Sequence, residues 1–143
     1  MEVTAIGDAV NVASRLEGRT KVLGVSALAS EASMRDARHE HHMSLRRVGA
    51  VRVKGRNEAV DPFELLDCVS SVEERAQKEA VHERFFQGLL AFMQSDLARA
   101  ERYFAAASAE APLDGVSRAY LARTREYLAD GLPRDFDGDL GRL

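Results

Sequence analysis

The sequence predicts an α+β fold in its first half, residues 1–70, followed by an all-α helical tail over residues 71–143. Two observations predict this division. Strand-like alternation and short helical patterns are mixed up to residue 70, whereas apolar residues beyond it recur at helical spacing. The charge also changes there: Lys and Arg balance Asp and Glu over residues 1–70, so the whole net charge of −3 lies in residues 71–143.

The composition is that of a globular protein, with 45% hydrophobic and 30% charged residues. The acidic balance argues against a general nucleic-acid binder, which needs a basic stripe. The single cysteine, Cys68, cannot form an internal disulfide and suits a reducing compartment, where a lone buried thiol acts as a small hydrophobic group. No apolar run is long enough to span a membrane, and the first residues do not resemble a signal peptide. We therefore expect a cytoplasmic chain.

In the first half, residues 2–6 ("EVTAI") predict a strand that Gly7 ends. Asp8 is a natural N-cap for a helix that begins at Ala9 and ends at Gly18. The remaining elements are expected to be a strand, a short helix, an alternating strand on either side of Gly49, and a last strand that Pro62 pushes toward a sheet edge or a bulge; they cover residues 22–30, 31–38, 43–55 and 59–69.

The second half predicts three helices. The first covers residues 71–94 and places four large apolar side chains on one face: Val81, Phe85, Leu89 and Phe92. The second begins at a Ser95 or Asp96 cap and runs to Pro112. The third begins at Asp114 and ends at Gly131, with an aligned face made of Leu121, Thr124 and Leu128.

Small and large residues of the tail resemble one tetratricopeptide unit, which has a period of about 34 residues. The residues at matching spacings are Gly88, Ala100, Phe104, Ala107 and Pro112. We expect one tetratricopeptide-like unit followed by a capping helix. One unit cannot bury its own apolar face, so we expect the tail to pack against the first half or to bind a protein partner.

Asn11 and Arg15 are four residues apart, so they project from one face of the predicted first helix. A carboxamide and a guanidinium near a helix start suit a ribose and phosphate ligand, because the helix dipole and the planar fork of Arg both favour anions. A solvated helix face has the same spacing, and the residues alone leave both interpretations open.

The stretch "GDAVNVASRLEG" (residues 7–18) resembles the signature helix of the class III nucleotidyl cyclases, which form cyclic AMP or cyclic GMP. "VRVKG" followed by "EAVDPFELL" resembles the final pair of strands of that family, so the resemblance covers residues 2–67. It implies that residues 1–70 form the C-terminal half of the ferredoxin-like cyclase domain. The tail is similar to the helices that follow this domain in many bacterial members, some of which are tethered to a membrane through N-terminal segments.

The resemblance implies a role for four residues. Asn11 would orient the ribose, and Arg15 would stabilise the charge that develops on the α-phosphate. Lys54 would hold the terminal phosphates, although a solvated lysine at a strand end is the alternative. Thr4 occupies the base-selecting position, where its hydroxyl can accept from the adenine amino group, although it is also an ordinary strand residue.

The family also needs Mg²⁺ or Mn²⁺, two metal-binding aspartates and a purine-selecting lysine, which lie in a half of the domain that is absent from this sequence. Its sites form between two subunits of a homodimer, one of which gives the metals while the other gives Asn11 and Arg15. We expect no metal ligand in this chain, and Asp8 is interpreted as a helix cap. The chain is expected to act on ATP only together with the missing half, and Met1 is expected to reflect a truncation.

Three other groups are set aside. His39, His41 and His42 are close in sequence, but a solvated loop is the simpler interpretation. "DFDGDL" (residues 135–140) lacks the ligand pattern of a calcium loop and is expected to pack Phe136 onto the helices. Basic residues that alternate along a strand are too diluted for nucleic-acid binding; they are Arg46, Arg47, Arg52, Lys54 and Arg56.

Two hypotheses from different classes remain. The first is a fragment of an adenylate cyclase that supplies base-selecting and transition-state-stabilising residues. The second is a non-catalytic interaction module made of a half-cyclase fold and tetratricopeptide-like helices. The reading frame upstream of Met1 would separate them, because codons for two aspartates in strand-like surroundings favour the first.

Overall fold

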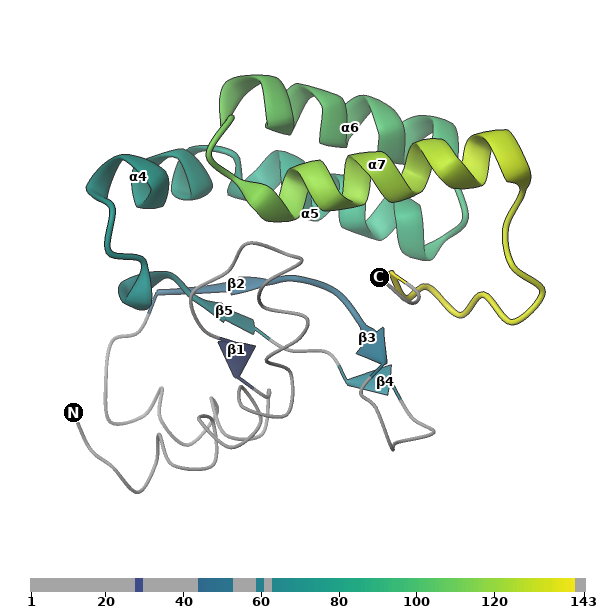
Figure 1. Ribbon diagram of the computed structural model, residues 1–143, viewed down its shortest axis with the longest axis horizontal. Coiled ribbons are helices and arrows are strands. Elements are labelled where there is room, and N and C mark those ends of the chain that lie inside the picture. Colours follow the sequence, from purple (N-terminus) through teal and green to yellow (C-terminus); the bar gives the residue numbers. More distant parts are fainter. Residues whose placement is uncertain (1–27, 30–43, 53–58, 61–62, 141–143) are drawn as a thin grey trace.

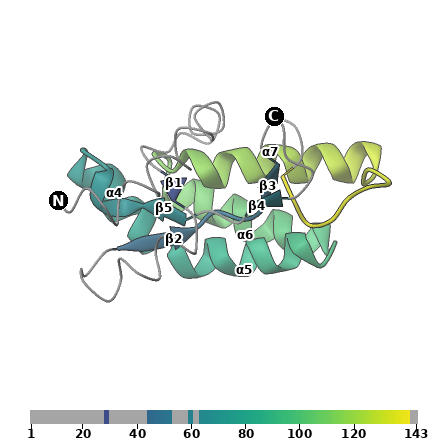
Figure 2. The same cartoon turned by 90° about the horizontal axis from the view of Figure 1, so that it is seen from below.

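The structure is a computed structural model that describes residues 28–29, 44–52, 59–60 and 63–140. These residues are mostly helical, with short antiparallel strands. Three helices lie on one side of the strands, and Figures 1 and 2 show the same arrangement from two directions. They are α5 (His82–Met93), α6 (Leu97–Glu110) and α7 (Gly115–Asp130). The shorter α4 (Val72–Ala80) connects the strands to this group.

The described strands form two antiparallel sheets. In the larger sheet, β5 (Phe63–Leu65) lies between β1 (Leu28–Ala29) and β2 (Leu45–Arg47). Its register places Arg46 directly opposite Glu64. In the smaller sheet, β3 (Val51–Arg52) pairs with β4 (Ala59–Val60).

The predicted strand over residues 43–55 does divide at Gly49, because β2 ends before this glycine and β3 begins after it. Gly49 has a φ of +85°, a left-handed conformation that favours glycine. The single strand predicted over residues 59–69 is wrong in two respects. β4 and β5 are separate strands in different sheets, and β5 lies at the centre of its sheet rather than at an edge. Residues Leu66–Cys68 then form a short 3-10 helix, η1.

The predicted helix boundaries in the tail depend on capping residues. The side chain of Asp96 accepts a hydrogen bond from the backbone N–H of Arg99 at the start of α6. Asp114 and Gly131 flank α7, as the sequence predicts. In the part of the chain that the structure describes, no helix is both long and apolar enough to cross a membrane.

The single helix predicted over residues 71–94 is wrong, because the chain turns at Val81 between α4 and α5. Val81 is fully buried against Ala107 and Ala111. The apolar spacing continues across this residue, so the break leaves no trace in the sequence pattern. The turn lets α4 bring Lys78 to the sheet while α5 packs along α6.

The packing face of α7 also differs from the prediction. Tyr120, Thr124 and Tyr127 are buried, whereas Leu128 is 49% exposed. The rings of the two tyrosines lie in the core, where they contact the phenylalanines of α5 and α6. Large aromatic side chains bury more apolar area than leucine, so they set the orientation of the helix.

One hydrophobic core joins the helices to the strands. It contains Val48 from the strand region, aromatic residues from three helices, and Leu140 from the last described segment. Phe136 packs against this core, with its ring centroid 5.5 Å from that of Phe92 and 5.8 Å from that of Tyr127. The prediction that Phe136 packs onto the helices is therefore confirmed.

Candidate functional site at the contact between strands and helices

The predicted site residues Thr4, Asn11, Arg15 and Lys54 lie outside the described residues, as do the three clustered histidines at 39, 41 and 42. Their proposed roles are therefore untested by the structure. Among these residues, Lys54 is two residues beyond Arg52, the last residue of β3, which the structure does describe. The contacts that hold β2 and β3 in place are thus the described structure nearest to Lys54 along the chain.

A cluster of four buried charges connects β2 and β5 to α4 and α7. The Arg46 guanidinium donates to Glu64 Oε2 from Nη2 at 2.6 Å and from Nε at 3.0 Å. It also donates to both Asp114 carboxylate oxygens, at 2.7 and 2.8 Å. Lys78 donates to the other oxygen of Glu64. Each of these four side chains has an exposed fraction of 0%, so the cluster is removed from water.

The charges in this cluster balance, and each one is hydrogen-bonded. Burial on its own would raise the pKa of Asp114, but the hydrogen bond and charge of Arg46, helped by Ser117 and Lys78, hold that pKa below its ordinary value. Burial works against the charge of Arg46 as well, yet Asp114 and Glu64 keep its pKa raised. The Arg46 guanidinium also lies 5.0 Å from the centre of the Phe85 ring. Removing any one member would leave an unbalanced charge in the buried cluster.

A second contact lies two residues further along the chain. The Tyr120 hydroxyl of α7 donates a hydrogen bond to the Val48 carbonyl at 2.6 Å, and both groups are buried. At Gly49 a Cβ atom would come 2.2 Å from the Tyr120 hydroxyl oxygen and 2.7 Å from Leu89 Cδ1. The helices therefore pack directly on the backbone there.

The last described segment reaches the same place. The backbone N–H of Leu140 donates to the Ala50 carbonyl at 3.3 Å. Leu140 is fully buried, and Gly138, with a φ of +91°, packs on Met93 at the end of α5. This part of the tail folds back along the helices and meets the strands between β2 and β3 (Figure 1).

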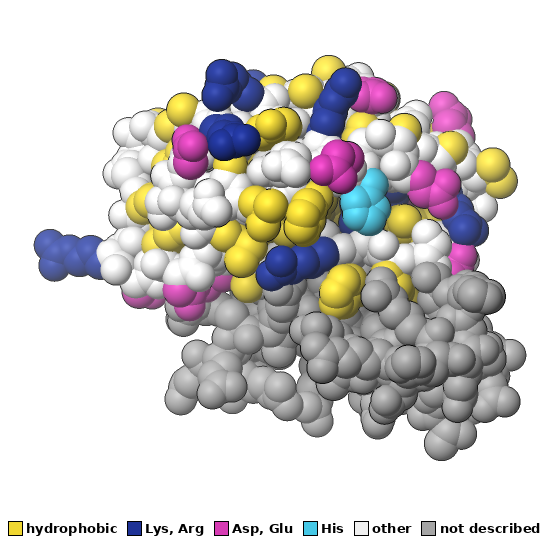
Figure 3. Space-filling view, turned by 180° about the vertical axis from the view of Figure 1, so that it is seen from behind, with side chains coloured by type: hydrophobic (Ala, Val, Ile, Leu, Met, Phe, Trp, Pro, Cys, Tyr) yellow, Lys and Arg dark blue, Asp and Glu magenta, His cyan; other side chains and the backbone are white. Residues whose placement is uncertain are grey.

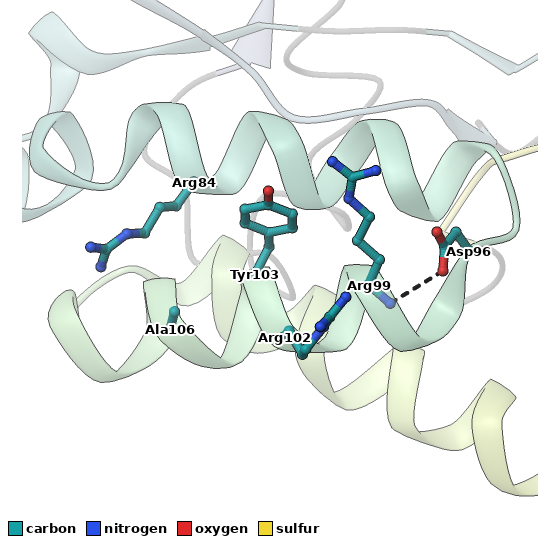
Figure 4. Close-up of a pocket in the computed structure, with 6 residues that line it drawn as sticks. All are labelled: Arg84, Asp96, Arg99, Arg102, Tyr103 and Ala106. Atoms are coloured by element: carbon teal, nitrogen blue, oxygen red, sulfur yellow. Dashed lines mark hydrogen bonds between the residues drawn. The ribbon is translucent and has the colours of Figure 1, made fainter.

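An open cavity of about 830 Å³ lies on α5 and α6, away from this contact. It is lined by Arg84, Asp96, Arg99, Arg102, Tyr103 and Ala106 (Figure 4). Arg84 is paired with Glu110, and the Arg99 guanidinium lies 5.8 Å from the centre of the Tyr103 ring. Figure 3 shows basic side chains on the face of the molecule seen from behind, although residues 71–143 carry a net negative charge.

Metal and thiol chemistry have little support in the described ranges. Within them, no group of three His, Cys, Asp or Glu side chains converges where a metal ion could bind. Cys68 is exposed, not buried as a lone thiol is expected to be. Burial of part of its side chain and the charge of Asp67 raise its pKa, which keeps the thiol protonated.

The sequence did not single out Glu64, Lys78, Asp114 or Tyr120 for this contact, and it considered Arg46 only as one of five basic residues too diluted for nucleic-acid binding. Arg46 is in fact buried, a role that the sequence analysis did not predict. In the structure, Leu45 and Arg46 are adjacent on β2 and both are buried, so side chains on both faces of this strand are covered. A strand covered on both faces cannot be recognised from alternation, which assumes one wet face.

The chain is partly similar to adenylate cyclases. It is 43% identical over 72 residues to adenylate cyclase 1 of Rhizobium meliloti (strain 1021), a match that covers 50% of this chain and 10% of that protein. It is 44% identical over 66 residues to adenylate cyclase of Anabaena cylindrica, covering 46% of this chain and 13% of that protein. The chain thus spans about a tenth of the length of these curated relatives. No protein-family model and no solved structure matches it.

Proposed function

We propose that residues 1–70 are the C-terminal half of a class III adenylate cyclase domain and that residues 71–143 are a helical tail with one tetratricopeptide-like unit and a capping helix. The observation that carries the proposal is the 43% identity to adenylate cyclase 1 over 72 residues, about the length of the first half. The close packing of Gly88 against Phe104, where a Cβ would lie 2.7 Å from the ring, supports a paired-helix unit.

In the proposed reaction, the ribose 3′-hydroxyl of ATP attacks the α-phosphate, cyclic AMP forms and pyrophosphate leaves. Asn11 orients the ribose, and Arg15 stabilises the charge that develops on the α-phosphate. Lys54 holds the terminal phosphates, and the Thr4 hydroxyl accepts from the adenine amino group. Mg²⁺ or Mn²⁺ belongs to the complete enzyme, with its ligands outside these 143 residues, and the partner is a second cyclase subunit. The 143-residue polypeptide alone is therefore expected to form no cyclic AMP.

A chimera tests this proposal directly. Adenylate cyclase 1 of Rhizobium meliloti would carry this chain in place of its matching segment, and cyclic AMP formation from ATP would be measured with Mg²⁺ or Mn²⁺. We expect turnover, with kcat falling roughly a hundredfold to a thousandfold in Arg15→Ala, because that donor acts mainly in the transition state. Lys54→Ala should mainly raise KM, since the phosphates are bound before and during the reaction.

The matched control is Arg125→Ala, which changes an exposed arginine on the tail outside the cavity and should leave kcat unchanged. Circular dichroism and a thermal melt establish that each variant is folded. A folded chimera without turnover, or one in which Arg15→Ala is as fast as its parent, contradicts the proposal.

The basic cavity on α5 and α6 favours a second candidate function, an interaction module that binds an acidic segment of a partner protein. Arg84, Arg99 and Arg102 line the cavity against a single acidic side chain, Asp96. A fluorescent Glu-rich peptide is the probe, and its binding should weaken in Arg99→Glu and Arg102→Glu and at higher salt. Arg134→Glu makes the same charge change elsewhere and should bind as the wild type does. Equal loss in all three variants would show only non-specific attraction.

A further inference from the structure

We infer that the helical tail is a positioning element for the strand pair that leads to Lys54, an inference that rests on the proposed function for the role of Lys54. Three parts of the tail contact three consecutive residues, 48–50, which form the β2–β3 connector. Tyr120 of α7 donates to the Val48 carbonyl, Leu89 of α5 packs over Gly49, and Leu140 donates to the Ala50 carbonyl.

The contact leaves little freedom to the connector. Gly49 has no side chain, so the Tyr120 hydroxyl and Leu89 come within van der Waals range of its backbone. Its φ of +85° turns the chain between β2 and β3. Because Val48 and Tyr120 both belong to the buried core, this contact cannot be replaced by water without opening the core.

The buried charge cluster supplies a second point of attachment on the same helix. Arg46 is held by Asp114 at the start of α7, and Val48 is held by Tyr120 six residues later. Six helical residues span about 9 Å, and two residues of strand span about 7 Å. Contacts at two points fix the direction of the strand relative to α7 as well as its position.

The connector also fixes one end of the strand pair beyond it. β3 begins at Val51 and pairs with β4, so the two strands are held as a unit by the connector at that end. Lys54 lies two residues after the end of β3. The tail thus sets where the strand that precedes Lys54 begins. Tyr120 is accordingly a positioning residue and not a catalytic one, and movement of α7 would change the hold on the terminal phosphates.

The first experiment uses the 143-residue chain and needs no activity. Hydrogen exchange would be followed at the β3–β4 ladder, Val51–Arg52 and Ala59–Val60, in the wild type and in Tyr120→Phe. The variant keeps the ring but leaves the buried Val48 carbonyl without its donor, so we expect exchange there to be about tenfold faster while α6 is unchanged. Tyr103→Phe, on the cavity face, is the matched control and should exchange as the wild type does. Unchanged exchange in Tyr120→Phe would overturn the inference.

The second experiment is a double-mutant cycle in the chimera. Tyr120→Phe should raise KM for ATP roughly threefold to tenfold with little change in kcat, and it should add nothing in the Lys54→Ala background. Full additivity with Lys54→Ala would overturn the inference, because Tyr120 would then act elsewhere. If Lys54→Ala itself leaves KM unchanged, the proposed function fails at that residue, while the exchange result still decides whether the tail holds the strands.

Discussion

At the scale of single residues, Arg46 occupies a place where arginine is rarely found. Its guanidinium is enclosed between the carboxylates of Glu64 and Asp114 and lies over the Phe85 ring. Arg suits such a place because its planar fork can satisfy two carboxylates at once. The neighbouring Lys78 pairs with the remaining oxygen of Glu64, so the buried positive and negative groups are equal in number.

Replacing Arg46 with alanine should destabilise the chain by about 3–5 kcal/mol, because the carboxylate of Asp114 would stay buried without its partner. Urea unfolding followed by circular dichroism measures this change. Arg125→Ala is the matched control: its side chain is 59% exposed and pairs with Glu101, and its loss should cost no more than about 1 kcal/mol. Equal losses in the two variants would show that the buried cluster contributes no more than a surface pair.

Because Asp114 is paired with Arg46, we expect the free energy of unfolding to depend on pH in the acid range. Its pKa in the folded chain is held below the value of an unfolded Asp, about 3.9. The stabilisation is therefore fully present above about pH 4 and is lost as the pH falls through the lowered pKa. Urea midpoints between pH 7 and pH 2.5 should drop less steeply at the acid end in Asp114→Asn than in the wild type. Asp130→Asn, an exposed change at the end of α7, should follow the wild-type curve.

At the scale of elements, α5 and α6 approach each other closely at Gly88. A Cβ there would come 2.7 and 2.8 Å from two ring carbons of Phe104 and 3.1 Å from Tyr103 Cβ. Phe104 is fully buried among other aromatic rings and has little room to move. The contact sets the distance between α5 and α6.

Gly88→Ala should therefore destabilise the chain by about 1–3 kcal/mol, although alanine favours a helix more than glycine does. Thermal and urea unfolding would measure the change. Gln87→Ala, one residue earlier on the same helix, is the control and should be close to neutral. A stabilised Gly88→Ala would mean that the two helices can separate without loss.

The sequence predicts the helices of the tail better than it predicts the way they pack. The boundaries predicted at Asp96, Asp114 and Gly131 are confirmed, and at Asp96 the local capping hydrogen bond is present, whereas the Asp114 side chain makes no capping bond and binds Arg46 instead. The turn at Val81 and the buried face of α7 are decided by contacts with distant segments. Helical spacing alone did not separate Leu128, which is half exposed, from the buried Tyr127 beside it.

At the scale of the whole molecule, the strands and the helical tail share one core and one buried charge cluster. The core includes Val48 together with Phe85, Leu89 and Tyr120. To predict this contact from the sequence, one would have to identify the two carboxylates that pair with Arg46. They are 18 and 68 residues away along the chain, so no local pattern links them to Arg46. The predicted catalytic residues Asn11 and Arg15 and the predicted substrate-binding residues Thr4 and Lys54 stay predictions, because they fall outside the residues that the structure describes.

A fragment containing only residues 71–143 should be much less stable than the whole chain. It would lack Arg46 and Glu64, which leaves Asp114 without its counter-ion, and it would expose the aromatic surface of Phe85 and Tyr120. Thermal unfolding followed by tyrosine fluorescence suits this test, because all three tyrosines lie in the tail. A fragment of residues 44–143 keeps these contacts and should melt close to the full chain. Equal melting of the 71–143 fragment would show that the tail folds independently.

The pairing of Arg46 with two carboxylates also constrains how this chain can change over generations. Positions 46, 64, 78 and 114 hold two positive and two negative groups in one dry place, so a substitution at one of them leaves an odd charge until a second position compensates. We expect these positions to vary together among descendants of the chain and seldom one at a time. A recombination event that joined a foreign tail after residue 70 would bring new residues to two of the four positions, 78 and 114. Such an exchange would succeed only when the incoming segment already carried a matching cation and anion, and the two halves are for this reason expected to be inherited as a pair.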